Sequence, residues 1–231
     1  MTHRELRAKV RAVHDALEAH FGVPVWSRRA DPLTSLIVTI LSQNTNDVNR
    51  DRAYSSLRAR FRTWEDVLAA EPEAVAEAIR VGGLSGQKSV RIKRVLEWVG
   101  DTYGALSLDA ICEMPTDEVF ELLGALPGVG TKTISVVLSF ACGRDVFPVD
   151  THIHRIARRL GFVPTSASAE KTHRTMAVLV PQGKAYSFHI NLLRFGRSIC
   201  KAGRPRCGEC FIFKHCQYHP TIRPDSATGG P

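Results

Sequence analysis

Four cysteines near the end of the chain have the spacing of a metal-binding site. They are separated by six, two and five residues and are Cys200, Cys207, Cys210 and Cys216. Thiols this close in sequence can be gathered around one centre at little cost in chain entropy. An iron–sulfur cluster and a tetrahedral zinc ion both accept four cysteine ligands. Zinc remains an alternative because it accepts the same ligands, although zinc sites usually have two Cys-x₂-Cys pairs and only one is present here. Two disulfides are a further alternative, but nothing indicates the oxidising compartment that they need.

The segment between the first two of these cysteines is basic. It contains Lys201, Arg204 and Arg206, and the whole chain has 31 Lys and Arg against 23 Asp and Glu, for a net charge of +8. A charge balance of this kind suits a polyanionic partner. A loop stapled by a metal would hold Lys201 and Arg206 against phosphates, so we predict contact with nucleic acid.

A glycine-rich turn offers a second anion site. The sequence Leu126-Pro-Gly128-Val-Gly130-Thr-Lys132 separates a helix ending near Leu123 from an apolar helix that begins at about Thr131. Gly128 and Gly130 allow close approach of the backbone, and the N–H groups at the start of a helix bind phosphate. An ordinary helix–helix turn has the same features. From the residues alone, Lys132 is best read as a phosphate contact.

Helical periodicity runs through nearly the whole chain. Leu6, Val10, Val13 and Leu17 form one face of a first helix, and Asp31-Pro32 is a helix start. No sustained alternation indicates strands, so the fold class is all-α. Cys112 and Cys142 lie in apolar settings and are interpreted as separate small buried hydrophobes. No apolar run approaches the roughly 20 residues of a membrane span, which predicts a soluble, intracellular protein without a membrane partner.

Three motifs in register resemble the endonuclease III family. They are Leu-Pro-Gly-Val-Gly with Lys132 two residues on, Asp150 eighteen residues later, and Cys-x₆-Cys-x₂-Cys-x₅-Cys. The resemblance extends from about residue 36 to 216. It implies a [4Fe–4S] cluster on the four cysteines and two helical lobes with DNA in the cleft between them. One lobe is a six-helix barrel with a helix-hairpin-helix over 25–143; the other is a cluster domain over 1–24 and 144–219, followed by a disordered tail at 220–231.

The resemblance also assigns catalytic roles to Lys132 and Asp150. A lysine amine can attack the anomeric carbon of a deoxynucleotide and leave a Schiff base, which permits β-elimination of the 3′ phosphate. Asp150 would assist proton removal and offset positive charge on the sugar. Its position before a helix would equally be explained by N-capping alone.

Two loops are expected to enter the DNA once a base is extruded. The family places a polar filler in the first loop and an apolar wedge in the second, which here correspond to Gln43 or Asn44 and to Leu84. Helix capping and simple turn formation explain the same loops without DNA. Gly82 and Gly86 replace the bulkier residues of better-known members.

These features predict a bifunctional DNA glycosylase and apurinic/apyrimidinic lyase that excises oxidised pyrimidines in base excision repair. The expected partner is duplex DNA with damaged pyrimidines or abasic sites. We expect a cytoplasmic, nucleoid-associated monomer of prokaryotic type. Adenine–mismatch glycosylases of the same superfamily lack a lysine at the place of Lys132. The alternative of another class is a weakly active or non-catalytic helix-hairpin-helix DNA-binding protein.

Overall fold

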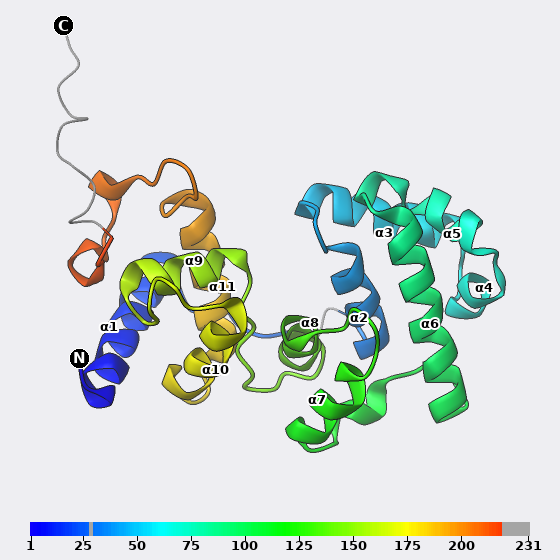
Figure 1. Cartoon of the computed structure of the whole chain (residues 1–231), viewed down its shortest axis with the longest axis horizontal. Helices are drawn as coiled ribbons and strands as arrows, with labels where there is room; N and C mark the ends of the chain where they lie inside the picture. Colours follow the sequence, from blue (N-terminus) through cyan, green and yellow to red (C-terminus); the bar gives the residue numbers. More distant parts are fainter. Residues whose placement is uncertain (28–29, 219–231) are drawn as a thin grey trace, which may run out of the picture. The chain divides into compact units, whose positions relative to one another are not determined.

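A computed structural model describes residues 1–27 and 30–218, and these residues form helices without a strand (Figure 1). The all-α prediction is therefore confirmed, while the predicted tail at 220–231 lies outside the described residues. No helix in the described ranges combines the length and the apolarity needed to cross a membrane.

The helices follow one another with short connections. The α-helices are α1 His3–Phe21, α2 Pro32–Leu41, α3 Asp47–Arg60, α4 Trp64–Ala69, α5 Pro72–Ala78, α6 Ser85–Tyr103, α7 Thr116–Gly124, α8 Thr131–Val136, α9 Thr151–Leu160, α10 Ala169–Leu179 and α11 Ala185–Ser198. The shorter segments are the 3₁₀ turns η1 Arg80–Gly82, η2 Asp109–Cys112, η4 Cys207–Glu209 and η5 Phe213–His215, and the π-helical turn η3 Val137–Ala141.

The chain divides into two compact units. One comprises Met1–Trp26 together with the described part of Asp145–Pro231, and the other comprises Ser27–Arg144. The assignment of a six-helix barrel to the second and of a cluster domain to the first stays a prediction.

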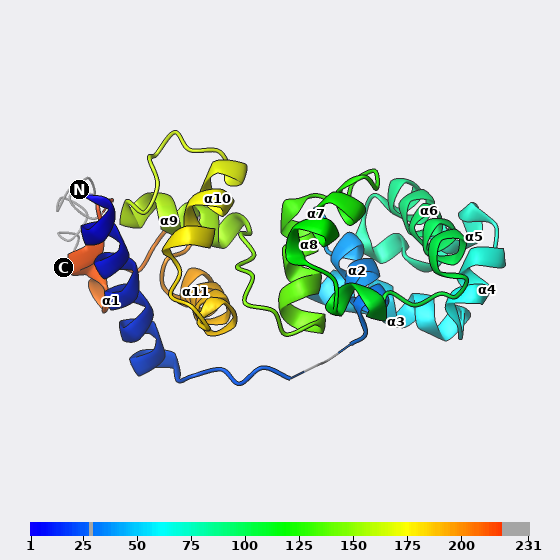
Figure 2. The same cartoon turned by 90° about the horizontal axis from the view of Figure 1, so that it is seen from below.

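In the unit that contains both chain ends, α1 packs against α11 and α10, and α9 packs against α11 (Figure 2). The predicted face of the first helix is confirmed, because Val10, Val13 and Leu17 are fully buried. They share one core with apolar side chains of the C-terminal helices, among them Ile153, Ile156, Leu160, Phe188, Leu192 and Phe195. Burial of this shared core holds the N-terminal helix to the segment that carries the four cysteines.

In the Ser27–Arg144 unit, the apolar helix α2 packs against α3, α6, α8 and η3. Its start is as predicted: Asp31 accepts a hydrogen bond from the Thr34 N–H at 2.8 Å, and Pro32 occupies the first turn. Seven of its ten residues are buried. Because α2 packs against four other elements of this unit, the start of the loop that follows Leu41 is held in place.

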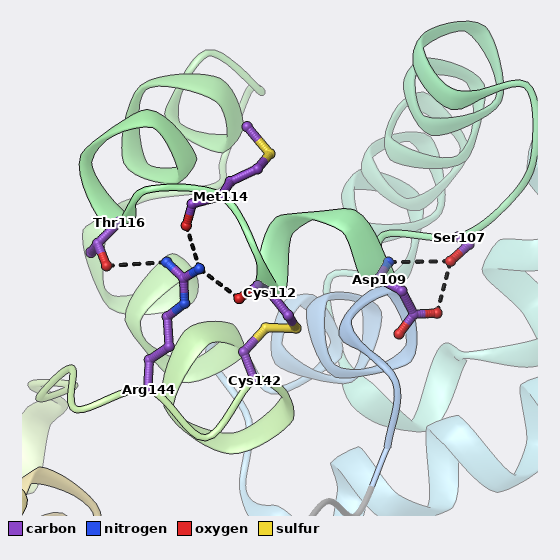
Figure 3. The surroundings of a disulfide bond; sticks show 7 residues. All are labelled: Ser107, Asp109, Cys112, Met114, Thr116, Cys142 and Arg144. Carbon is purple, nitrogen blue, oxygen red and sulfur yellow. Dashed lines mark hydrogen bonds between the residues drawn. A yellow bond between two sulfur atoms is a disulfide. The ribbon is translucent and has the colours of Figure 1, made fainter.

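A disulfide in this unit contradicts one interpretation from the sequence. Cys112 of η2 and Cys142, directly after η3, are joined by an S–S bond of 2.01 Å (Figure 3). They are therefore not separate buried hydrophobes. The chain from α7 to η3 brings together two cysteines that are 30 residues apart. Arg144 reinforces the link by donating to the Cys112 carbonyl at 2.6 Å and to Thr116 Oγ1 at 3.1 Å.

Candidate nucleic-acid interface and metal centre

The glycine-rich turn between α7 and α8 is closed by a hydrogen bond from the Val129 N–H to the Leu126 carbonyl at 3.0 Å. Gly128 has φ +80°, and a Cβ placed there would lie 2.1 Å from the guanidinium of Arg91. The left-handed backbone therefore favours glycine at this position, whereas the flexible end of Arg91 can move away from a larger residue. Helix α8 begins at Thr131, as the sequence predicted.

Gly130 has no such requirement within the protein. Its φ is −102°, which any residue adopts, and no atom lies within 4 Å of an added Cβ. It is the N-cap of α8 without a side-chain cap, and Lys132 follows in the first turn, half-buried. The open space over Gly130 would let another molecule approach the backbone amides at the start of α8.

The loop after α2 contains two polar candidates with different surroundings. Gln43 accepts a hydrogen bond from Arg91 Nη1 and donates to the Gly128 carbonyl at 3.2 Å, so it braces the hairpin against α6. Asn44 is exposed and has φ +52°. Of the two residues left open by the sequence, Asn44 is the more exposed.

Leu84 is the N-cap of α6, with φ +51° and an exposed fraction of 47%. Across residues 1–27 and 30–218, Asn44 and Leu84 are the only residues other than glycine with a positive φ. A left-handed backbone costs about 1–2 kcal/mol for an ordinary L-residue such as leucine, whereas asparagine adopts it more readily. Strained residues of this kind gather at functional sites. Of the three residues that the resemblance assigns to these loops, Asn44 and Leu84 have a positive φ and Gln43 does not.

Asp150 lies in the other unit, where it caps α9. Its Oδ1 accepts from the Ile153 N–H at 2.8 Å, as N-capping predicts. His154 in the same helix bonds through Nδ1 to Thr172 Oγ1 of α10 at 2.8 Å, which makes it a packing residue. The predicted site residues are therefore divided between the units: Gln43, Asn44, Leu84, Gly128, Gly130 and Lys132 belong to Ser27–Arg144, whereas Asp150, Lys201, Arg206 and the four cysteines belong to the other.

The four cysteines line one cavity. Its empty space is about 400 Å³, part of it open to solvent, and it is walled by side chains that include Arg159, Phe195 and Phe213. Cys200, Cys207, Cys210 and Cys216 are all free thiols, which excludes two disulfides. Burial raises the pKa of Cys210 to about 11. In the described ranges no three His, Cys, Asp or Glu side chains form a group that could hold a metal ion, so the predicted cluster site stays a prediction.

Two arginines of α9 hold the cysteine segment in place. Arg155 donates to the Cys200 carbonyl at 2.8 Å. Arg159 donates to the Cys200 sulfur at 3.3 Å and to the Lys201 carbonyl at 2.7 Å. Lys201 and Arg206 are exposed, and Arg206 is 3.5 Å from Glu209. Sequence reasoning missed the arginines because their partners are backbone carbonyls more than 40 residues away.

Comparison with known proteins identifies the family. Residues 37–182 match the family model of the HhH-GPD superfamily base excision DNA repair proteins. The chain belongs to this superfamily. It is 35% identical to endonuclease III of Thermotoga maritima over 192 residues, which cover 83% of this chain and 85% of the relative. The resemblance to the endonuclease III family is thus confirmed.

Solved structures agree with this superfamily assignment. A non-covalent endonuclease III–DNA complex superimposes with a TM-score of 0.81 at 28% identity, covering 96% of this chain and 98% of that one. A trapped endonuclease III–DNA covalent intermediate matches with the same TM-score at 29% identity, covering 96% and 100%. Membership of the HhH-GPD superfamily, with relatives of this kind, supports a DNA glycosylase that acts in base excision repair.

Proposed function

We propose that this HhH-GPD protein is a bifunctional glycosylase and apurinic/apyrimidinic lyase for oxidised pyrimidines in duplex DNA. The observation that carries the proposal is Lys132 in the first turn of α8, directly behind the open surface at Gly130. A phosphate bound over Gly130 would bring a deoxyribose near this amine. A relative of the same fold has been trapped as a covalent intermediate with DNA, which requires a nucleophilic side chain.

In the proposed reaction, the Lys132 amine attacks the anomeric carbon and the glycosidic bond breaks. The departing base takes the bonding electrons and then a proton. Loss of the amine proton and opening of the sugar leave an iminium ion, which acidifies the neighbouring carbon. Proton loss there expels the 3′ phosphate, and water releases Lys132 by hydrolysis. The carboxylate of Asp150 offsets the positive charge that develops on the sugar and assists removal of the amine proton.

The exposed side chains have distinct proposed roles on the DNA. The amides of Gly128 and Gly130 bind a phosphate, and Lys201 and Arg206 add charge-dependent contacts. Asn44 fills the space left by the extruded nucleotide, and Leu84 wedges into the stack. Phosphate contacts place the enzyme, while the two inserted side chains probe whether a pair opens readily. We expect the enzyme to act on chromosomal DNA in the cytoplasm as a monomer.

A [4Fe–4S] cluster is the metal centre that we propose for the cysteine cavity. The support is the resemblance to the endonuclease III family, together with four free thiols that line one cavity. We propose that Cys200, Cys207, Cys210 and Cys216 bind the cluster and that it holds this segment together. Arg155 and Arg159 then hold the same segment through its backbone. The cluster's role is to fix Lys201 and Arg206 for phosphate contact.

Borohydride trapping tests the catalytic proposal. Wild-type protein, Lys132→Ala and the surface control Lys171→Ala are incubated with duplexes that contain an oxidised pyrimidine, an abasic site or no damage. Wild type and Lys171→Ala should form a covalent complex on the first two duplexes, and Lys132→Ala should form none yet keep much of its DNA affinity. Trapping by Lys132→Ala would place the nucleophile elsewhere. Binding by wild type without base release or trapping would instead indicate a non-catalytic DNA-binding protein.

A further inference from the structure

A buried lysine joins the two loops that present Asn44 and Leu84. Lys88 of α6 has an exposed fraction of only 2%. Its ammonium donates to the Leu41 carbonyl at 2.8 Å and to the Gly82 carbonyl at 2.7 Å. No carboxylate among the described residues forms an ion pair with it. Burial, followed by the charge of Arg91, lowers the pKa of Lys88. A buried cation held only by backbone carbonyls is unfavourable unless it has a specific task.

Both carbonyls lie just before an exposed residue with a left-handed backbone. Leu41 is the last residue of α2, three positions before Asn44, and Gly82 is the last residue of η1, two positions before Leu84. The last carbonyls of a helix accept no hydrogen bond from within the helix, and a cation close to them is favourable. One residue therefore holds the backbone of both loops.

The surroundings of Lys88 leave these loops little freedom. A Cβ on Gly82 would lie 3.1 Å from the Cβ of Ala53 in α3, so η1 is packed closely against that helix. A left-handed residue persists only where its neighbours determine the backbone on every side. The Lys88 ammonium supplies this constraint from the protein interior, because it donates hydrogen bonds to the ends of both α2 and η1.

We propose that Lys88 is a positioning residue that fixes the spacing of Asn44 and Leu84, so that the two side chains enter the base stack together. This inference rests on the proposed insertion of these residues. Lys88 does not touch the DNA. It acts by making insertion at both positions a single event, which favours a site whose base pair is already weakened over an intact duplex.

The chain offers a matched control on the same helix. Lys93 of α6 also donates to two backbone carbonyls, those of Leu68 and Ala70, but these end α4 and precede no residue with a positive φ. Lys88→Met and Lys93→Met each remove one ammonium from two carbonyls while keeping an unbranched side chain. A general loss of packing would affect both variants; a loss of loop spacing would affect only the first.

The probe is a duplex with a tetrahydrofuran abasic analogue opposite 2-aminopurine, compared with an undamaged duplex. Wild type should bind the analogue more tightly and change the 2-aminopurine fluorescence. Lys88→Met should lower the affinity ratio between the two duplexes by about tenfold, a usual size for coupling between sites. It should leave the affinity for undamaged duplex unchanged, and Lys93→Met should behave as wild type. An absent fluorescence change in wild type would refute insertion itself, which separates failure of the proposed function from failure of this inference.

A double-mutant cycle tests whether Lys88 acts through the loops. In protein carrying Asn44→Ala and Leu84→Ala, the further change Lys88→Met should barely alter the affinity ratio, whereas an independent structural role would add its full effect. Lys88→Gln serves if Lys88→Met does not fold, because its shorter amide keeps donors but cannot span both carbonyls. A folded variant of either kind with the wild-type affinity ratio overturns the inference.

Discussion

Substitution of Gly130 by serine would separate what the fold needs from what DNA needs at the hairpin. The backbone at Gly130 is in the extended region, and no atom lies within 4 Å of an added Cβ. Serine is also a better N-cap than glycine by a few tenths of a kcal/mol. We therefore expect Gly130→Ser to fold with a melting temperature at or slightly above that of wild type.

The same Cβ would occupy the space that we assign to a phosphate. A hydrogen bond to a charged group contributes about 1.5–3 kcal/mol. Loss of one amide–phosphate bond should therefore weaken binding about 10- to 100-fold. The loss should be equal for damaged and undamaged duplexes, because phosphate contacts carry no sequence information.

Fluorescence anisotropy over a series of salt concentrations measures this effect. The amide is uncharged, so Gly130→Ser should lower affinity without changing the slope of log K against log salt. Arg206→Ala should reduce that slope by about 0.9. Gly100→Ala is the control: its added Cβ meets only Leu106 at 3.6 Å in the interior of α6. If Gly130→Ser binds duplex as tightly as wild type and Gly100→Ala do, no phosphate lies over the hairpin.

Three further predictions address the other unit. Asp150→Asn keeps an acceptor for the Ile153 N–H and should fold normally, yet base release should fall by on the order of 100-fold while cleavage of a preformed abasic site falls less, as measured on the two duplexes in parallel. Protein purified without oxygen should contain about four irons per chain and lose them in Cys207→Ser, whereas one zinc per chain would refute the cluster. Burial, and next Arg158, lower the pKa of His154 below its ordinary value near 6.5. The unfolded chain then binds the extra proton first, so stability present above pH 6.5 should be lost as the pH falls towards the lowered pKa; His154→Gln should flatten this part of a plot of melting temperature against pH.

Local signals were sufficient for the elements that position the site. Capping by Asp31 and Asp150, the start of α8 and the apolar face of α1 each depend on residues within a few positions of one another, and all are present as predicted. Helical periodicity likewise indicates the all-α class, because apolar residues recur at helical spacing within each short segment.

Contacts between distant segments were beyond these signals. Hydrogen bonds from Arg91 to Gln43 and from Gln43 to Gly128 join helix α6, the loop after α2 and the glycine-rich turn. They engage the Gln43 side chain within the protein, while Asn44 is exposed. The disulfide between Cys112 and Cys142 depends in the same way on how the chain brings η2 back to the end of η3. Neither arrangement leaves a pattern in the local sequence.

Helix α9 connects Asp150 with the segment that carries the four cysteines. Its ten residues span about 15 Å, with Asp150 at the first end and Arg159 near the last. A displacement of the cysteine segment would pull on Arg155 and Arg159 and thereby tilt the helix whose opposite end is capped by the Asp150 carboxylate. The helix thus acts as a short rigid connection, and in the proposed mechanism damage to the cysteine segment would change the orientation of that carboxylate.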